Sequence, residues 1–192
     1  MKNLETALLL AREEFSRRIP SVMAQKAGVA AGGDGRLVVP FYGREYVFPV
    51  KKGETVPADK EILILHYLVR APGILPVGEK VSLKELPNGF IYNESFRKRV
   101  IRPLVSAFGG RPELLVTAGA KVGGKPVPCG DAAVELLALP RLPLVFMIWN
   151  GDDEFPADGN VLFDAAVSAY LSVEDCVVLA QMGVSALREA LG

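Results

Sequence analysis

Four carboxylates lie within the seven positions 152–158, directly after the most apolar segment of the chain. They are Asp152, Asp153, Glu154 and Asp158. Clustered carboxylates hold Mg²⁺ or Ca²⁺ through their oxygens, and they raise one another's pKa and so supply a general acid. The spacing differs from that of an EF-hand loop, which needs alternating ligands and a Glu at its twelfth position. Three interpretations stay open: a divalent metal site, a loop that contacts a ligand or partner, and a solvated acidic turn.

The only histidine, His66, lies in an apolar segment between Leu65 and Tyr67. One imidazole excludes a two-histidine metal site, and the absence of a Gly-x-Ser-x-Gly motif gives no support to a Ser-His-Asp triad. One imidazole is enough for one axial bond to haem iron or corrinoid cobalt. The alternative is a core histidine that donates a hydrogen bond to a backbone carbonyl.

Two further features have the chemistry to contact a cofactor. Trp149, the only tryptophan, ends the apolar segment before the acidic loop. Its ring would either stack on a planar ligand or cover the edge of the core. Arg97, Arg99 and Arg102 form a basic run on a predicted helix. Such a run suits the phosphate or carboxylate side arms of a cofactor, or it is a solvated helix face.

Composition excludes several classes of function. The chain has 192 residues, of which 50% are hydrophobic, so a buried core is expected rather than disorder. Twenty-two Lys and Arg residues balance 22 Asp and Glu residues, which argues against a nucleic-acid partner. The 2 cysteines, Cys129 and Cys176, are too few for a four-thiolate iron–sulfur cluster or zinc site. They are expected to be reduced thiols in a cytoplasm.

Neither a signal peptide nor a membrane span is expected. Charged residues interrupt the N-terminal region, and the longest strongly apolar run covers the eight residues 142–149. A membrane-spanning helix needs about 20 apolar residues. We therefore expect a cytoplasmic protein without membrane partners.

Hydrophobic periodicity predicts the elements that position these residues. Apolar residues at spacings of three or four predict helices over the ranges 3–19, 58–70, 93–108, 111–123 and 161–171, and from residue 172 onwards. Asp59, Asn93 and Ser172 are expected to cap three of these helices, and Pro103 to kink or break one. Alternating residues predict a β-hairpin over 36–50 that turns at Gly43-Arg44, and an antiparallel strand pair over 131–149.

These elements predict an α+β fold with a small, mostly antiparallel sheet and helices packed around it. Four glycines between residues 27 and 35 predict a flexible joint. We therefore expect an N-terminal helix and glycine-rich joint over residues 1–35, followed by a single α+β domain over residues 36–192.

Several segments together resemble an uncharacterised prokaryotic family, domain of unknown function 3786, over roughly residues 36 to 180. The matching segments are 62–68, 78–82, 85–86, 140–149, 151–157, 162–164, 170–171 and 174–175. Members of this family are often described as iron–sulfur cluster proteins. Because this chain lacks a cysteine-rich segment, no cluster is expected in it.

The family resemblance implies a setting in anaerobes, in one-carbon and corrinoid metabolism, and so a corrinoid- or haem-related binding role. The family pattern includes the histidine and the acidic loop. The site candidates are therefore His66, Trp149, Asp152, Asp153, Glu154 and Asp164.

We accordingly predict a binding or accessory protein for a tetrapyrrole, corrinoid or haem, rather than an enzyme. His66 would be the axial ligand and Trp149 would line the pocket, while the side arms would meet Arg97, Arg99 and Arg102. One alternative is a small hydrolase or lyase that uses a divalent ion on the loop from Asp152 to Glu154. Another is a protein-interaction module whose acidic loop docks a basic partner.

Overall fold

Two antiparallel sheets organise the chain, which the computed structural model describes over residues 2–51 and 53–192. The smaller sheet has the order β1 (Ala30–Ala31), β2 (Leu37–Phe41), β3 (Arg44–Phe48). The larger sheet has the order β4 (Lys80–Ser82), β8 (Asp158–Asp164), β7 (Leu142–Trp149), β6 (Ala132–Leu139), β5 (Lys125–Pro126). With the helices below, this is the predicted α+β fold.

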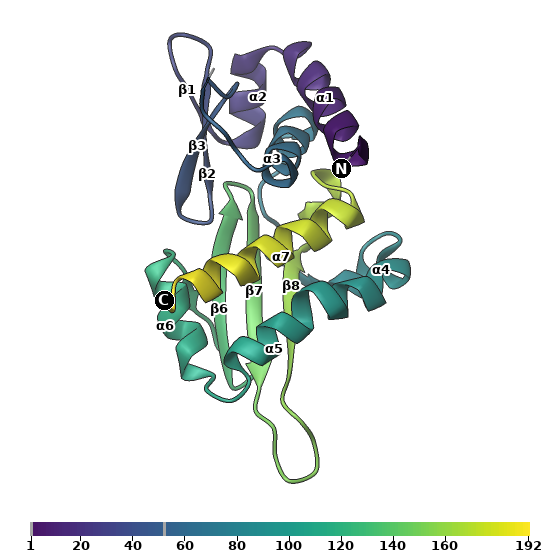
Figure 1. Cartoon of the computed structure of the whole chain (residues 1–192), viewed down its shortest axis with the longest axis vertical. Coiled ribbons are helices and arrows are strands. Elements are labelled where there is room, and N and C mark those ends of the chain that lie inside the picture. The colour runs from purple at the N-terminus through teal and green to yellow at the C-terminus, as the bar shows by residue number, and fades with distance from the viewer. Residues whose placement is uncertain (1, 52) are drawn as a thin grey trace.

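The helices form two groups around these sheets. Three helices lie beside the smaller sheet in the upper part of Figure 1: α1 (Lys2–Ser16), α2 (Pro20–Ala27) and α3 (Ala58–Arg70). The others lie with the larger sheet: α4 (Gly89–Phe96), α5 (Arg102–Phe108), α6 (Glu113–Lys121) and α7 (Val173–Glu189). Helices α5 and α7 cross one face of the larger sheet. Short 3-10 turns cover Leu83–Glu85 and Ala165–Ala169.

The core lies between the larger sheet and these crossing helices. Successive strand residues point to opposite faces, so Leu144, Phe146 and Ile148 of β7 all enter the main core and are fully buried. Val145 and Met147 point to the other face, where they form a small second cluster. Phe146 pairs with Val134 of β6 and Val161 of β8. The antiparallel pair predicted over 131–149 is confirmed.

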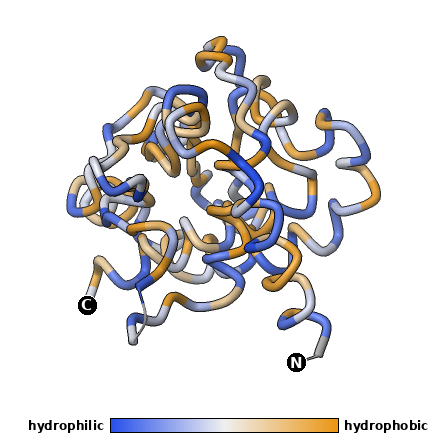
Figure 2. Tube along the Cα trace, turned by 90° about the horizontal axis from the view of Figure 1, so that it is seen from above, coloured by the Kyte–Doolittle hydropathy of each residue, from blue (hydrophilic) through white to orange (hydrophobic). Residues whose placement is uncertain are grey.

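The N-terminal helices contribute to the same main core. Ala11 and Phe15 of α1 and Met23 of α2 are buried in one cluster with Phe146. The smaller sheet is joined to β6 because the backbone N–H of Tyr42 donates to the carbonyl of Ala138 at 3.2 Å. Hydrophobic and hydrophilic residues alternate along most of the trace in Figure 2, as expected when each element buries one face.

One long helical segment runs from Gly89 to Phe108. Phe96, Val100, Leu104 and Phe108 are all buried on one face, as the spacing predicts. The helix start that the sequence predicts at Asn93 is wrong. The helix already begins after Asn88, which adopts a left-handed backbone conformation.

Pro103 does not break this segment. A π-helical turn over Arg97–Ile101 directly precedes α5. A proline lacks the N–H that an α-helix needs and crowds the carbonyl four residues earlier, and a wider turn accommodates both effects.

Residues 161–171 are not a helix. Residues 161–164 belong to β8, and a 3-10 turn follows. Val161 and Phe163 are fully buried while Asn160 and Leu162 are partly exposed, which is the two-residue period of a strand. A short apolar run alone does not distinguish the period of a strand from that of a helix.

Two end positions also differ from the predicted ones. Asp59 does not cap α3, because the N-cap position is Pro57. The hairpin turns at Tyr42-Gly43, which both have positive φ, rather than at Gly43-Arg44. The predicted capping box of Ser172 and Asp175 at the start of α7 is confirmed.

Gly183 lets α7 approach the larger sheet, and replacing it should destabilise the fold. A Cβ there would lie 2.3 Å from Phe146 Cζ and 2.6 Å from the Tyr42 hydroxyl. We expect Gly183→Ala to lower the free energy of unfolding by about 1–3 kcal/mol, measured by denaturant titration. Gly110→Ala is the control, because a Cβ at Gly110 meets nothing within 4 Å. Equal stability of the two variants would contradict this packing.

Candidate functional site

His66 lies where α3 packs against the N-terminal end of α7. Its Nδ1 is 3.0 Å from Oδ1 of Asp175. A carboxylate only accepts hydrogen bonds, so Nδ1 donates this bond and Nε2 is the ring nitrogen left for another partner. Within the described residues Nε2 has no hydrogen-bond partner, and the side chain is 22% exposed. The imidazole is thus held by one nitrogen and open at the other.

Asp175 is itself held by several groups. Arg70 Nη1 lies 3.1 Å from Oδ2, and Ser172 Oγ donates to the same oxygen at 2.8 Å. Burial opposes ionisation of this carboxyl, but hydrogen bonds and charge from His66, Ser172 and Arg70 outweigh it and lower the Asp175 pKa. The result is a carboxylate that fixes both His66 and Arg70.

Trp149 and Arg97 belong to a different part of the molecule. They line a cavity of about 290 Å³ together with Asp158, and Arg97 Nη2 lies 3.3 Å from Asp158 Oδ1. His66 does not line this cavity. In Figure 1, β7 carries Trp149 at its lower end, whereas α3 lies at the top. The predicted pocket of His66 and Trp149 is therefore not formed.

The other two predicted arginines have different surroundings. Arg99 Nε donates to Oε1 of Gln181 on α7 at 2.9 Å, and Arg102 is exposed at the start of α5. Arg97, Arg99 and Arg102 all lie on the segment that follows α4. Among the described residues, none of the three makes a hydrogen bond or ion pair with His66 or Asp175.

The acidic loop projects beyond the lower edge of the larger sheet (Figure 1). Asp152 Oδ1 accepts the backbone N–H groups of Glu154 at 2.9 Å and Phe155 at 2.7 Å, and these bonds lower the Asp152 pKa. The side chains of Asp153 and Glu154 are exposed and have no partner in the described chain. Across residues 2–51 and 53–192, no three His, Cys, Asp or Glu side chains gather as a metal site would require.

Asp164, a site candidate that the family resemblance implies, has the surroundings of a residue that stabilises the fold. Its side chain is buried and accepts the backbone N–H groups of Val77 at 3.0 Å, Gly78 at 2.7 Å and Ala166 at 3.0 Å. These bonds tie the end of β8 to the segment before β4. The carboxylate has no oxygen facing solvent that would bind a ligand.

The two cysteines are separate free thiols. Cys176 is fully buried on α7, and burial raises the pKa of its thiol well above the usual range. Cys129 is partly buried, and its Sγ lies 3.7 Å from Met147 Sδ. A neutral buried thiol is not a nucleophile, so Cys176 is a core residue, as predicted.

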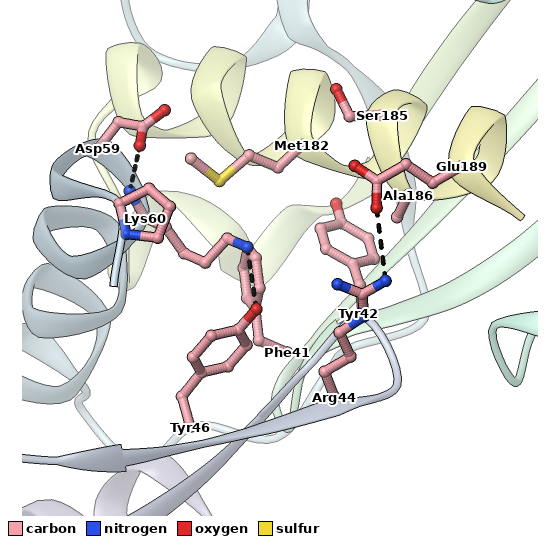
Figure 3. Close-up of a pocket in the computed structure, with 11 residues that line it drawn as sticks. Phe41, Tyr42, Arg44, Tyr46, Asp59, Lys60, Met182, Ser185, Ala186 and Glu189 are labelled. Carbon is pink, nitrogen blue, oxygen red and sulfur yellow. Dashed lines mark hydrogen bonds and ion pairs between the residues drawn. The ribbon is translucent and has the colours of Figure 1, made fainter. Parts of the chain in front are cut away.

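A small aromatic cavity, which the sequence analysis did not identify, lies between the β2–β3 hairpin, α3 and α7 (Figure 3). It measures about 180 Å³. Lys60 Nζ donates to the Tyr46 hydroxyl at 2.9 Å and lies 5.0 Å from the centre of that ring and 5.9 Å from the Phe41 ring. The aromatic faces are thus already in contact with a cation of the same chain.

A second feature missed by the sequence analysis is an ion pair between α1 and α3. Arg12 Nε lies 2.6 Å from Oε1 of the buried Glu61. These residues are 49 positions apart, so no local pattern could have connected them.

A family model matches most of this chain. The model, described as "Domain of unknown function (DUF3786)", covers residues 20–186. Comparisons with curated proteins and with solved structures gave no significant match. None of the described helices is long and apolar enough to cross a membrane.

The lowered pKa of Asp175 predicts a specific acid sensitivity. A carboxyl whose pKa is lower in the folded state contributes stability above its unfolded pKa of about 3.9, and this contribution is lost as pH falls. We expect Asp175→Asn to lose roughly 1–3 kcal/mol at pH 7 and to depend less on pH than the wild type between about pH 5 and pH 3. Chemical denaturation across this range measures both effects.

Asp153→Asn is the matched control, because Asp153 is exposed and unpaired. It should leave the acid limb of the stability profile unchanged. An Asp175→Asn profile parallel to that of the wild type would show that Asp175 is not the group responsible.

Proposed function

Because the chain belongs to the family described as Domain of unknown function (DUF3786), a description that assigns no activity, we propose a function from the geometry. The protein is a binding or accessory protein that holds a tetrapyrrole, corrinoid or haem, with His66 as axial ligand. One observation supports this proposal: Nδ1 of His66 is paired with Asp175, while Nε2 of the partly exposed ring has no partner among the residues that the structure describes.

A carboxylate behind the imidazole suits metal binding. Histidines that bind metals usually donate their second ring N–H to a carboxylate, a carbonyl or water. That bond fixes the tautomer and makes the free nitrogen a better donor to the metal. Asp175 would do this for His66, and Ser172 and Arg70 hold Asp175 in place.

Arg70 is a further cation that could meet a side arm, beside the three arginines of the sequence-based hypothesis. It follows His66 by four positions on α3 and so lies on the same helix face. Its side chain is 42% exposed, and one of its nitrogens contacts Asp175. The remaining N–H groups are available to a carboxylate side arm, which haem carries.

Titration with haemin and with aquocobalamin tests this proposal by absorption spectroscopy. We expect a saturable band shift for at least one of them, because axial binding changes the spectrum of the metal centre. His66→Ala should abolish the shift. Asp175→Asn should weaken binding about 10–100-fold, which is the usual effect of losing the group behind a ligating histidine.

Trp149→Phe serves as the control, because Trp149 lies outside the proposed site. It should bind like the wild type. A shift that survives His66→Ala, or an unchanged spectrum with both compounds, would overturn the assignment.

We propose a second candidate, an interaction module, on a different observation. Phe155 is 67% exposed on the projecting loop, beside the unpaired carboxylates of Asp153 and Glu154. Aromatic residues are enriched at protein interfaces, whose rims are polar and accessible to solvent. The partner would present basic side chains around an apolar surface.

Affinity capture of a partner on immobilised protein tests this candidate. Capture should decrease as salt rises, because ionic contacts between exposed groups are screened. The double variant Asp153→Asn/Glu154→Gln should lose capture, whereas Glu14→Gln/Glu45→Gln, which removes the same charge elsewhere on the surface, should not. A partner retained equally by both variants and at all salt concentrations would contradict it.

A further inference from the structure

The side chain of Glu61 is nearly inaccessible to solvent, whereas the side chain of its partner, Arg12, is accessible. The Glu61 side chain is 4% exposed and the Arg12 side chain is 52% exposed. Arg12 donates from Nε to Oε1 at 2.6 Å and from Nη2 to Oε2 at 2.8 Å. An ion pair of this kind adds little net stability compared with two apolar side chains. Its clear structural effect is to hold the guanidinium plane in one orientation.

The held guanidinium still has free donors. Arginine carries five N–H groups, and two of them reach Glu61, which leaves three. Arg12 lines a cavity of about 600 Å³ between α1, α3 and the segment that follows β3. A guanidinium that is fixed on one edge and open on the other is suited to bind a carboxylate side by side.

The cavity combines this arginine with an apolar wall. Phe15, Pro20 and Val50 line it and keep part of their surface accessible, whereas the lining residues Phe48 and Leu65 are almost fully buried. A volume of about 600 Å³ falls within the range of small-molecule sites. Apolar walls with a few fixed polar groups are the usual composition of such sites.

The charges of the residues that line the cavity favour a ligand with a single negative charge. Its lining residues include the cations Arg12, Arg18 and Lys51, and the carboxylates of Glu54 and Glu61. Among the lining residues that the structure describes, three cations against two carboxylates leave a surplus of one positive charge. In the described part of the chain, the Arg18 and Lys51 side chains have no carboxylate partner.

We propose that this cavity binds a small organic monocarboxylate with an aromatic or aliphatic body. The carboxylate accepts the free N–H groups of Arg12, with Arg18 or Lys51 as a second cation. The body of the ligand lies against Phe15 and Val50. Glu61 is the positioning residue, because it acts through Arg12.

This site is separate from the one proposed for the tetrapyrrole. Leu65 lines the cavity, whereas His66, the next residue, pairs with Asp175 of α7. Neighbouring helix residues point about 100° apart. The carboxylate proposal therefore does not rest on His66 binding a metal.

Nuclear magnetic resonance and calorimetric titrations with 3-phenylpropionate and octanoate test the proposal. We expect saturable binding of at least one, with shifts of backbone amides around residues 12–18, 48–51 and 61–65. The neutral amide, 3-phenylpropionamide or octanamide, should bind at least about tenfold more weakly, because it lacks the charge-assisted bonds to Arg12. His66→Ala should bind the carboxylate like the wild type.

Variants locate the binding groups. Arg12→Lys keeps the charge beside Glu61 but loses the planar fork, and it should weaken binding about tenfold. Arg18→Gln and Lys51→Gln change exposed side chains, so they should fold normally, and at least one should weaken binding severalfold. Arg44→Gln, an exposed arginine paired with Glu189 outside the cavity, is the control and should have no effect.

Three results would overturn the proposal. One is the absence of saturable shifts with either carboxylate at several millimolar. Another is equal affinity for a carboxylate and its amide. The third is unchanged affinity in Arg12→Lys, Arg18→Gln and Lys51→Gln together.

Discussion

Burying a carboxylate is costly unless its oxygens find partners, and three carboxylates in this fold satisfy that requirement. Asp175 joins α7 to α3, Glu61 joins α3 to α1, and Asp164 joins β8 to the segment before β4. Each lies between elements that are distant in the sequence. The relative positions of α1, α3 and α7 therefore depend on ion pairs as well as on apolar packing. Losing one partner of such a pair leaves a charge without compensation, which costs more than the pair contributes.

The same requirement explains why the candidate groups differ in character. Asp164 is buried and accepts three backbone N–H groups, so it serves the fold. Asp175 and Glu61 each hold a side chain that stays partly open to solvent, namely His66 and Arg12. A buried acid behind an accessible base or cation gives that group a fixed orientation, which a flexible surface side chain lacks. In the acidic loop, by contrast, the described carboxylates of Asp152 and Asp158 are exposed, and they accept from backbone N–H groups of the loop and from Arg97.

Local patterns predicted the elements whose periodicity is long and regular. The strand pair over 131–149 and the buried face from Phe96 to Phe108 follow from spacing that persists over several turns or residues. The error at 161–171 arose because a short apolar run fits both periods, and the pairing of β8 with β7 decides the outcome. His66 and the capping role of Asp175 were each identified, but their contact, 109 positions apart, was not predictable. Trp149 and His66 were both candidate site residues, yet the length of β7 lies between the two regions in which they are found.

Helix α3 is the element on which both proposed sites depend. Glu61 and Leu65 are four positions apart and share the face toward α1, whereas His66 and Arg70 share the face toward the start of α7. A residue change that displaces α3 as a whole would disturb both faces. Changes confined to one face, such as those at His66 or at Arg18, separate the two. The apolar residues that anchor α3, including the fully buried Ile64 and Tyr67, are therefore poor sites for testing either function, because their loss would move both sets of groups.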